Sequence, residues 1–280
     1  MTFNPKRDFL VGIDSDGCAF NTMEAKHKQI FIPQAIESLG FGPIADRYRA
    51  VAERVNLYSR TRGSNRFISI MLCLQQLRED EALHSFVPDP APLQEYVESG
   101  RPLSNDSFAE WVGENPPDLL KRVLHWSATS NARIAAQQGE PEVFSGVGET
   151  ISAAREFANT MIVSATPAAA LQTEWEHAGL LGMMDVVAGQ EVGPKRDQLA
   201  SAVGAFEPDH CLMVGDAPGD HQAAQENGIL FFPVVPGAED DSWKELREEG
   251  LARFHAGTFR GEYEERLVTA YYRALDSHAG

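Results

Sequence analysis

Short apolar runs, each bounded by turn-forming or polar residues, recur along the sequence. Runs of this kind are typical of strands buried inside a parallel sheet. We expect four clear strands and one weaker strand. The clear ones lie at residues 8–14, 160–164, 210–215 and 230–235, and the weaker one at 184–188.

Helical patterns lie between these runs and are bounded by Gly or Pro. They cover residues 149–157, 168–177, 196–203 and 222–227. Strands that alternate with helices indicate βαβ units and a parallel sheet. The sequence therefore predicts an α/β fold with a Rossmann-like parallel sheet. Residues 242–279 form a tail, in which we expect an acidic stretch followed by a closing helix.

The segment after the first strand has a different pattern. It contains helical periodicity at residues 22–39, 44–57, 65–77 and 118–138, with Pro and Gly clusters between them and few strand signals. A structureless loop of this length is uncommon in a compact domain. We therefore predict a core made of residues 1–20 and 141–280, and an inserted all-helical domain at 21–140.

The chain of 280 residues is acidic, with a formal net charge of −17. A field of that sign repels nucleic acid and anionic membrane surfaces, so neither is an expected partner. No apolar run approaches the roughly 18 residues that a membrane-spanning helix needs. The first residues contain no apolar core of a signal peptide, and we predict a cytoplasmic protein.

Residues whose side chains can take part in catalysis or bind a ligand follow the predicted strands. In an open parallel sheet, ligands bind beyond the carboxyl ends of the strands. Carboxylates follow the first and fourth strands, a hydroxyl follows the second, and a lysine follows the weak strand. These residues are Asp14, Asp16, Ser164, Lys195, Asp216 and Asp220.

Several carboxylates gathered at one edge repel one another unless a cation neutralises them, and oxygen ligands suit Mg²⁺. A bound Mg²⁺ favours a phosphate as its next ligand, which Lys195 and Ser164 would help to hold. Asp14 is able to attack phosphorus. Asp16 stands close by in the chain to protonate the leaving oxygen and later to deprotonate water.

Four motifs in this order resemble those of the haloacid dehalogenase superfamily. They are Asp14-Ser15-Asp16-Gly17, the hydroxyl of Ser164, the lysine Lys195, and Gly215-Asp216-Ala217-Pro218-Gly219-Asp220. The match spans residues 8–235 apart from the helical insertion, whose position resembles the helical cap of that family. Many relatives have Gly-Lys-Pro around the lysine, whereas this chain has Gly193-Pro194-Lys195, followed by Arg196 as a second candidate cation.

The resemblance implies a role for each matched residue. Asp14 would be the nucleophile and a metal ligand, and Asp16 the general acid and base, with its backbone carbonyl on the metal. Asp216 would bind Mg²⁺, and Asp220 would bind it directly or through water. Ser164, Ala165 and Lys195 would bind the phosphate.

The expected function is hydrolysis of a small phosphorylated metabolite, a phosphomonoester, through a phosphoryl-aspartate. One alternative is a phosphomutase similar to β-phosphoglucomutase, which returns the phosphoryl group to a sugar hydroxyl. A second is a non-catalytic protein that binds a phosphorylated metabolite. No feature of the sequence indicates an oligomeric state.

Three arginines lie close together in the insertion, at Arg60, Arg62 and Arg66. One interpretation is a solvated helix edge. The other is a cationic cluster that contacts an anionic substrate when the cap closes. We expect at least one of the three to contact the substrate.

Overall fold

The computed structural model describes residues 5–113, 117–136 and 142–277. The chain divides into two compact units, one made of residues 1–23 and 139–278 and the other of residues 24–138. Each unit has its own hydrophobic core. The second unit is inserted in the chain between the first strand and the remainder of the first unit.

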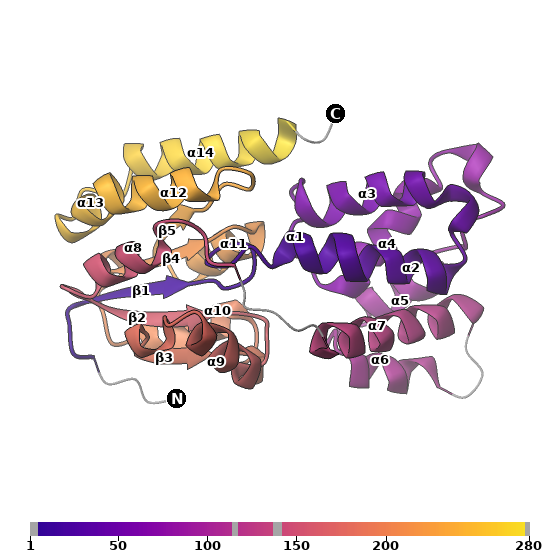
Figure 1. Cartoon of the computed structure of the whole chain (residues 1–280), viewed down its shortest axis with the longest axis horizontal. Helices are drawn as coiled ribbons and strands as arrows, with labels where there is room; N and C mark the ends of the chain where they lie inside the picture. The colour runs from indigo at the N-terminus through magenta and orange to yellow at the C-terminus, as the bar shows by residue number, and fades with distance from the viewer. Residues whose placement is uncertain (1–4, 114–116, 137–141, 278–280) are drawn as a thin grey trace. The chain divides into compact units, whose positions relative to one another are not determined.

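The first unit is built on a five-stranded sheet (Figure 1). Its strand order is β3-β2-β1-β4-β5, and every neighbouring pair is parallel. The α/β class with a parallel sheet is thus confirmed. The strands are β1 (Phe9–Ile13), β2 (Ala158–Val163), β3 (Val186–Ala188), β4 (Cys211–Gly215) and β5 (Leu230–Pro233).

Helices cover both faces of this sheet. One face packs through Val11, Ile13 and Val214 against the first group of helices below, and the other packs through Leu10 and Met213 against the second group. This double burial explains why the strands are almost continuously apolar. The first group is α8 (Val147–Ala154), α9 (Ala168–His177), α12 (Glu239–Glu245), η7 (Leu246–Gly250) and α13 (Leu251–His255); the second is α10 (Lys195–Val203) and α11 (Pro218–Glu226). Single turns connect them at η4 (Leu181–Met183), η5 (Gln190–Val192) and η6 (Pro208–His210).

The last helix, α14 (Glu262–Ser277), packs along the edge strand β5. Its residue Leu267 belongs to the core on one face of the sheet, and Val268 packs against the core on the other. Glu264 Oε1 accepts a hydrogen bond from the backbone N–H of Phe231, in β5, at 2.8 Å. The helix therefore covers an edge whose backbone donors would otherwise be open.

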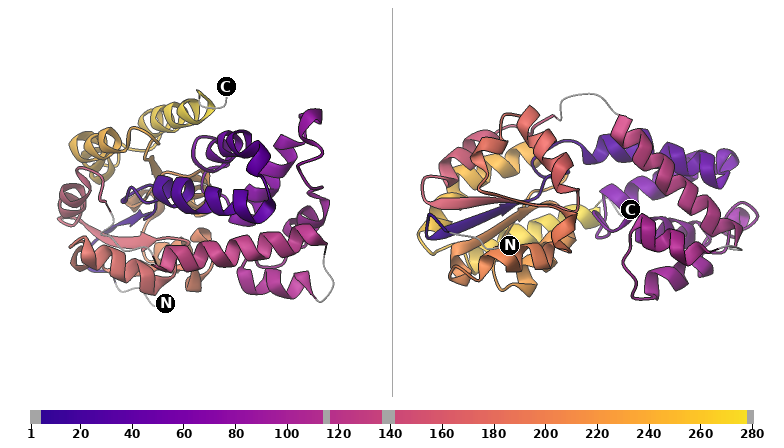
Figure 2. Two further views of the ribbon diagram at one scale, coloured as in Figure 1. Left: turned by 45° about the vertical axis from the view of Figure 1, so that its right-hand side comes forward. Right: turned by 90° about the horizontal axis from the view of Figure 1, so that it is seen from below.

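The described residues of the second unit are helical and contain no strand (Figure 2). Its core is rich in aromatic rings, among them Phe67, Tyr96 and Phe108, which contact one another. Its elements are α1 (Met23–Lys26), η1 (His27–Phe31), α2 (Ile32–Leu39), η2 (Gly42–Ile44), α3 (Ala45–Leu57), α4 (Arg66–Leu77), η3 (Glu81–Leu83), α5 (Ala91–Glu98), α6 (Asn105–Val112) and α7 (Asp118–Ala136).

The sequence pattern did not predict α5 and α6. Each has only eight residues, which is about two turns, and therefore shows little periodicity. Both are stabilised by packing, since Leu93, Tyr96 and Phe108 are completely buried. None of the described helices combines the length and the apolar character that crossing a membrane requires.

Candidate active site

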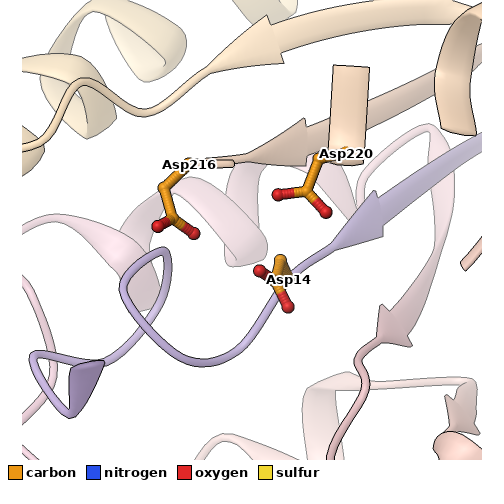
Figure 3. Close-up of side chains that lie close together, drawn as sticks. All are labelled: Asp14, Asp216 and Asp220. Carbon is orange, nitrogen blue, oxygen red and sulfur yellow. The ribbon is translucent and has the colours of Figure 1, made fainter. Parts of the chain in front are cut away.

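Three buried carboxylates meet at the carboxyl ends of the two central strands (Figure 3). Asp14 directly follows β1, Asp216 directly follows β4, and Asp220 lies in the first turn of α11. One carboxylate oxygen of each lies within 4.8 Å of the others, and their exposed fractions are 5%, 1% and 0%.

The strand order explains why this edge is a site. From β1 the chain proceeds outward to β2 and β3 on one side, and β4 and β5 then lie on the other side of β1. The connections thus diverge between β1 and β4, and ligands of open α/β sheets commonly bind at such a switch point. Asp14 and Asp216 stand at the two sides of this switch point.

Lys195 is the cation among these carboxylates. It is the first residue of α10, and its Nζ lies 2.8 Å from Asp14 Oδ2 and 2.5 Å from Asp220 Oδ1. Burial opposes the charge of the ammonium group, but the two carboxylates outweigh that effect and raise the pKa of Lys195 above its ordinary value. Lys195 therefore remains charged throughout the physiological range.

The site nevertheless has an excess of negative charge. Burial raises the pKa of the Asp14 carboxyl well above its ordinary value, Lys195 opposes this, and Asp220 and Asp216 add to it. Three carboxylates against one ammonium group leave a formal excess of two negative charges when all are ionised. Buried charge of this kind needs compensation. A cluster of oxygen donors with this charge fits a divalent cation that prefers oxygen ligands.

The spacing of the last motif has a steric cause. Asp220 folds back over the start of its own helix, and its Oδ2 accepts a hydrogen bond from the Ala217 N–H at 3.0 Å. A Cβ at position 215 would lie 2.5 Å from the Asp220 carboxylate, so only glycine fits there. Because its other oxygen accepts from Lys195, Asp220 joins the lysine to the loop that carries Asp216.

Asp16 lies in a tight turn after β1. The turn closes when the N–H groups of Ala19 and Phe20 both donate to the Ser15 carbonyl at 3.0 Å, with Gly17 at a φ of +81°. The indole N–H of Trp175 holds Ser15 Oγ at 3.0 Å. The turn is therefore fixed both by its own backbone and by a buried side chain from α9.

The Asp16 carboxylate contacts two hydroxyl groups. Thr166 Oγ1 donates to Asp16 Oδ2 at 3.3 Å, and Thr22 Oγ1 donates to Asp16 Oδ1. Sequence reasoning assigned no role to either threonine. Thr166 stands close to the carboxyl end of β2, and this position could have marked it as a candidate site residue. No feature of the sequence marked Thr22.

Gln198, which sequence reasoning missed, connects Ser164 to the loop that precedes Lys195. The completely buried Gln198 lies one turn after Lys195 on α10. Its Oε1 accepts from the Ser164 N–H at 3.0 Å, and its Nε2 donates to the Ser164 carbonyl at 2.8 Å and to the Gly193 carbonyl at 2.9 Å. Gln198 thereby ties the end of β2 to the loop before α10. A polar residue beside the buried Leu199 was the available signal.

Two other predicted residues of this edge lie farther out. Ala165 is exposed after β2. Arg196, the second candidate cation, has an exposed side chain that pairs with Asp197 at 2.8 Å. The structure thus brings Lys195, and not Arg196, to the buried carboxylates.

The three arginines of the insertion lie in the second unit. Arg60 is exposed in the turn between α3 and α4. Arg62 has an exposed fraction of 3% and donates to the Leu57 carbonyl at 2.8 Å. The interpretation of these residues as a solvated helix edge is therefore wrong for Arg62.

Arg66 is the first residue of α4, and its guanidinium is also engaged within the second unit. Its Nη1 lies 2.6 Å from Asn131 Oδ1 and 3.0 Å from Ser127 Oγ, and the group lies 5.0 Å from the centre of the Phe31 ring. Contact of any of these arginines with a substrate stays a prediction.

No protein-family model matches the sequence, and no curated protein matches it. Solved structures are similar to it. A haloacid dehalogenase-like hydrolase from Streptococcus pneumoniae is 14% identical, with 84% of this chain and 90% of that chain covered and a TM-score of 0.47. A HAD-superfamily hydrolase from Ehrlichia chaffeensis is 16% identical, with 90% and 100% covered and a TM-score of 0.46.

A protein from Haemophilus somnus described as a predicted phosphoglycolate phosphatase is 13% identical, with 86% of this chain and 98% of that chain covered and a TM-score of 0.46. The descriptions of the first two structures name the superfamily that the four motifs resemble.

Proposed function

We propose that the protein is a Mg²⁺-dependent phosphatase that hydrolyses a small phosphomonoester through a phosphoryl-aspartate on Asp14. The observation that carries this proposal is the position of Asp14. Its carboxylate stands at the end of the central strand, buried, 2.8 Å from the Lys195 ammonium group and beside Asp216 and Asp220. A nucleophile in contact with a cation, at an edge suited to a metal ion, is an arrangement for phosphoryl transfer.

The metal would be held by Asp14, Asp216 and the backbone carbonyl of Asp16, with Asp220 binding it directly or through water. Both Asp220 oxygens already accept hydrogen bonds, from Ala217 and from Lys195, which favours the water-mediated role. When bound, Mg²⁺ neutralises the carboxylates and the phosphate oxygens and so lets an anion approach them.

The chain's own residues perform the bond changes in two steps. In the first, an Asp14 oxygen bonds to phosphorus, the bond from phosphorus to the ester oxygen breaks, and Asp16 gives its proton to that oxygen. In the second, water attacks phosphorus while Asp16 takes a proton from it. The bond between Asp14 and phosphorus then breaks, which releases inorganic phosphate and restores both aspartates.

The remaining residues would bind the phosphate. Lys195 would offer its ammonium group to the phosphate oxygens, and Ser164 and Ala165, which follow β2, would complete the phosphate site. Gln198 fixes Ser164 relative to the helix that carries Lys195. The inserted residues 21–140 would serve as a cap that supplies specificity, with a small phosphorylated metabolite as the substrate.

The test is a phosphatase screen of the purified protein over a panel of phosphorylated metabolites with Mg²⁺, in which released inorganic phosphate is measured. We expect turnover of at least one monoester, its loss in EDTA and its return with added Mg²⁺. Turnover that survives exhaustive chelation would contradict the metal assignment. If no monoester or p-nitrophenyl phosphate is hydrolysed, the alternative of a non-catalytic binding protein gains support. Isomer formation from a sugar phosphate without phosphate release would instead indicate a phosphomutase.

A further inference from the structure

The segment that follows β5 reaches back to both loops that carry the candidate metal ligands. The indole N–H of Trp243, on α12, donates to the Cys18 carbonyl in the turn after β1 at 2.8 Å. The hydroxyl of Tyr271, on α14, donates to the Asp216 carbonyl after β4 at 2.9 Å. Both aromatic side chains are completely buried.

The contact of Tyr271 acts on one particular peptide group. The carbonyl of Asp216 and the N–H of Ala217 belong to the same peptide unit. Its oxygen accepts from Tyr271, and its N–H donates to Asp220 Oδ2 at 3.0 Å. A planar peptide held at both ends cannot rotate without breaking a buried hydrogen bond.

This peptide adjoins the Cα of Asp216, so its orientation sets the direction in which the Asp216 side chain leaves the loop. Asp220, which holds the other end of the peptide, is also the partner of Lys195 at 2.5 Å. The Tyr271 hydroxyl is therefore connected, through one peptide and one carboxylate, to the Lys195 ammonium group and to Asp14. Groups that orient metal ligands in this way commonly change metal affinity by about 10- to 100-fold when they are removed.

We propose that Tyr271 is a positioning residue for the metal site: its hydroxyl holds the Asp216–Ala217 peptide in the orientation that directs the Asp216 carboxylate toward the bound cation. This inference rests on the proposed function, which identifies the carboxylate cluster as a Mg²⁺ site. It gives the last helix of the chain a part in the chemistry in addition to its covering of the sheet edge.

Tyr271→Phe removes the hydroxyl and keeps the ring, and the chain offers a matched control on the same helix. Tyr263 is also buried on α14, and within the described part of the chain its hydroxyl makes no hydrogen bond. Tyr263→Phe therefore makes the same chemical change without removing a contact to the loop.

The measurement is the dissociation constant of Mg²⁺ for the substrate-free protein, by calorimetric titration, in wild type and both variants. We expect Tyr271→Phe to raise it about tenfold and Tyr263→Phe to leave it unchanged. We also expect saturating Mg²⁺ to restore most of the turnover of Tyr271→Phe.

An unchanged dissociation constant in Tyr271→Phe, beside a wild type that binds Mg²⁺, overturns the positioning role and leaves the proposed function intact. A rise that Tyr263→Phe shares equally also overturns it, because the effect then comes from the helix as a whole. A wild type that binds Mg²⁺ but hydrolyses no monoester contradicts the proposed function, while the comparison of the variants still decides the role of Tyr271.

Discussion

Lys195 Nζ lies 2.8 Å from Asp14 Oδ2 in the interior of the site, although strand β1 and helix α10 are far apart in the sequence. The pair has two consequences. The lysine holds the Asp14 carboxylate, the proposed nucleophile, in one orientation, and it offsets part of the repulsion from the neighbouring aspartates.

Asp14→Asn is expected to abolish turnover and to leave the fold intact. The amide has nearly the same shape but is not a nucleophile, so the loss should be at least about 10³-fold, as when other enzymes lose a nucleophile. The exposed Asp8, which precedes the same strand, provides the control Asp8→Asn. Steady-state kinetics together with circular dichroism make the test. Activity within tenfold of wild type in a folded Asp14→Asn variant would remove Asp14 from the nucleophile role.

Asp16→Ala is expected to slow turnover by roughly 10²–10⁴-fold, the usual contribution of a general acid–base group. The loss should be smaller for p-nitrophenyl phosphate, whose leaving group needs little protonation, than for an alkyl phosphate. The comparison of kcat/KM for the two substrates checks this. Equal losses on both would argue that Asp16 does not donate the proton.

Gln198→Leu is expected to lower the free energy of unfolding by about 1–3 kcal/mol, because it leaves buried backbone groups of Ser164 and Gly193 without their partner. It should also raise KM, since Ser164 loses its tie to the helix of Lys195. Gln222→Leu, an exposed change on α11, is the control. Denaturant unfolding and kinetics test the two effects. Wild-type stability and KM in Gln198→Leu would show that the buried amide has no such role.

The arginines of the insertion should separate into two classes. Arg62→Ala is expected to lower the free energy of unfolding by about 1–3 kcal/mol because its side chain is buried and bonded to the Leu57 carbonyl. The exposed Arg60→Ala should change it by less than about 0.5 kcal/mol.

A substrate contact at one of the three arginines should raise KM for the physiological substrate and hardly affect p-nitrophenyl phosphate. Single alanine variants of Arg60, Arg62 and Arg66 test this on both substrates. If all three have the KM of wild type on the physiological substrate, the arginines have no part in recognition.

Glu264→Gln is expected to raise the melting temperature near pH 7. Burial raises the pKa of the Glu264 carboxyl, although its hydrogen bond from Phe231 opposes this. Because the carboxyl pKa is raised in the folded protein, Glu264 contributes its full stability at pH values below 4.5, its pKa in the unfolded chain. That contribution is lost as the pH rises through the higher pKa of the folded state.

The neutral glutamine avoids that loss and keeps an oxygen for the Phe231 N–H. The melting temperatures of both proteins should therefore converge near pH 4 and diverge toward pH 7, and scans at several pH values measure this. A variant that is less stable than wild type at pH 7 would show that the carboxylate charge is favourable there.

The sheet was predictable from sequence because its strands coincide with short apolar runs that are separated by helical patterns. Since β1 and β4 are neighbours, the strand-end rule is enough to bring Asp14 and Asp216 to the same edge, although their catalytic roles remain predictions. The contacts of Gln198, Trp243 and Tyr271 were not predictable. Each joins a side chain to a backbone group of a distant loop, and such bonds leave no local pattern in the sequence.

The burial of Arg62 was hidden for a related reason. A charged residue in a turn is ordinarily exposed, and only the packing of the helical unit shows that this one is enclosed. The helices α5 and α6 likewise depend on tertiary contacts more than on their own periodicity.

The central position of β1 has a consequence for the order in which the protein folds during synthesis. Its register partners include Ala158 in β2 and Cys211 in β4, so β1 leaves the ribosome well before the strands that it pairs with. The second unit is translated in between, and its local contacts allow it to fold first. Asp14 therefore meets Asp216 only after the helical unit has been translated, and Tyr271 reaches the loop later still. A premature stop before α14 would yield a nascent chain with every carboxylate of the site but without this last contact.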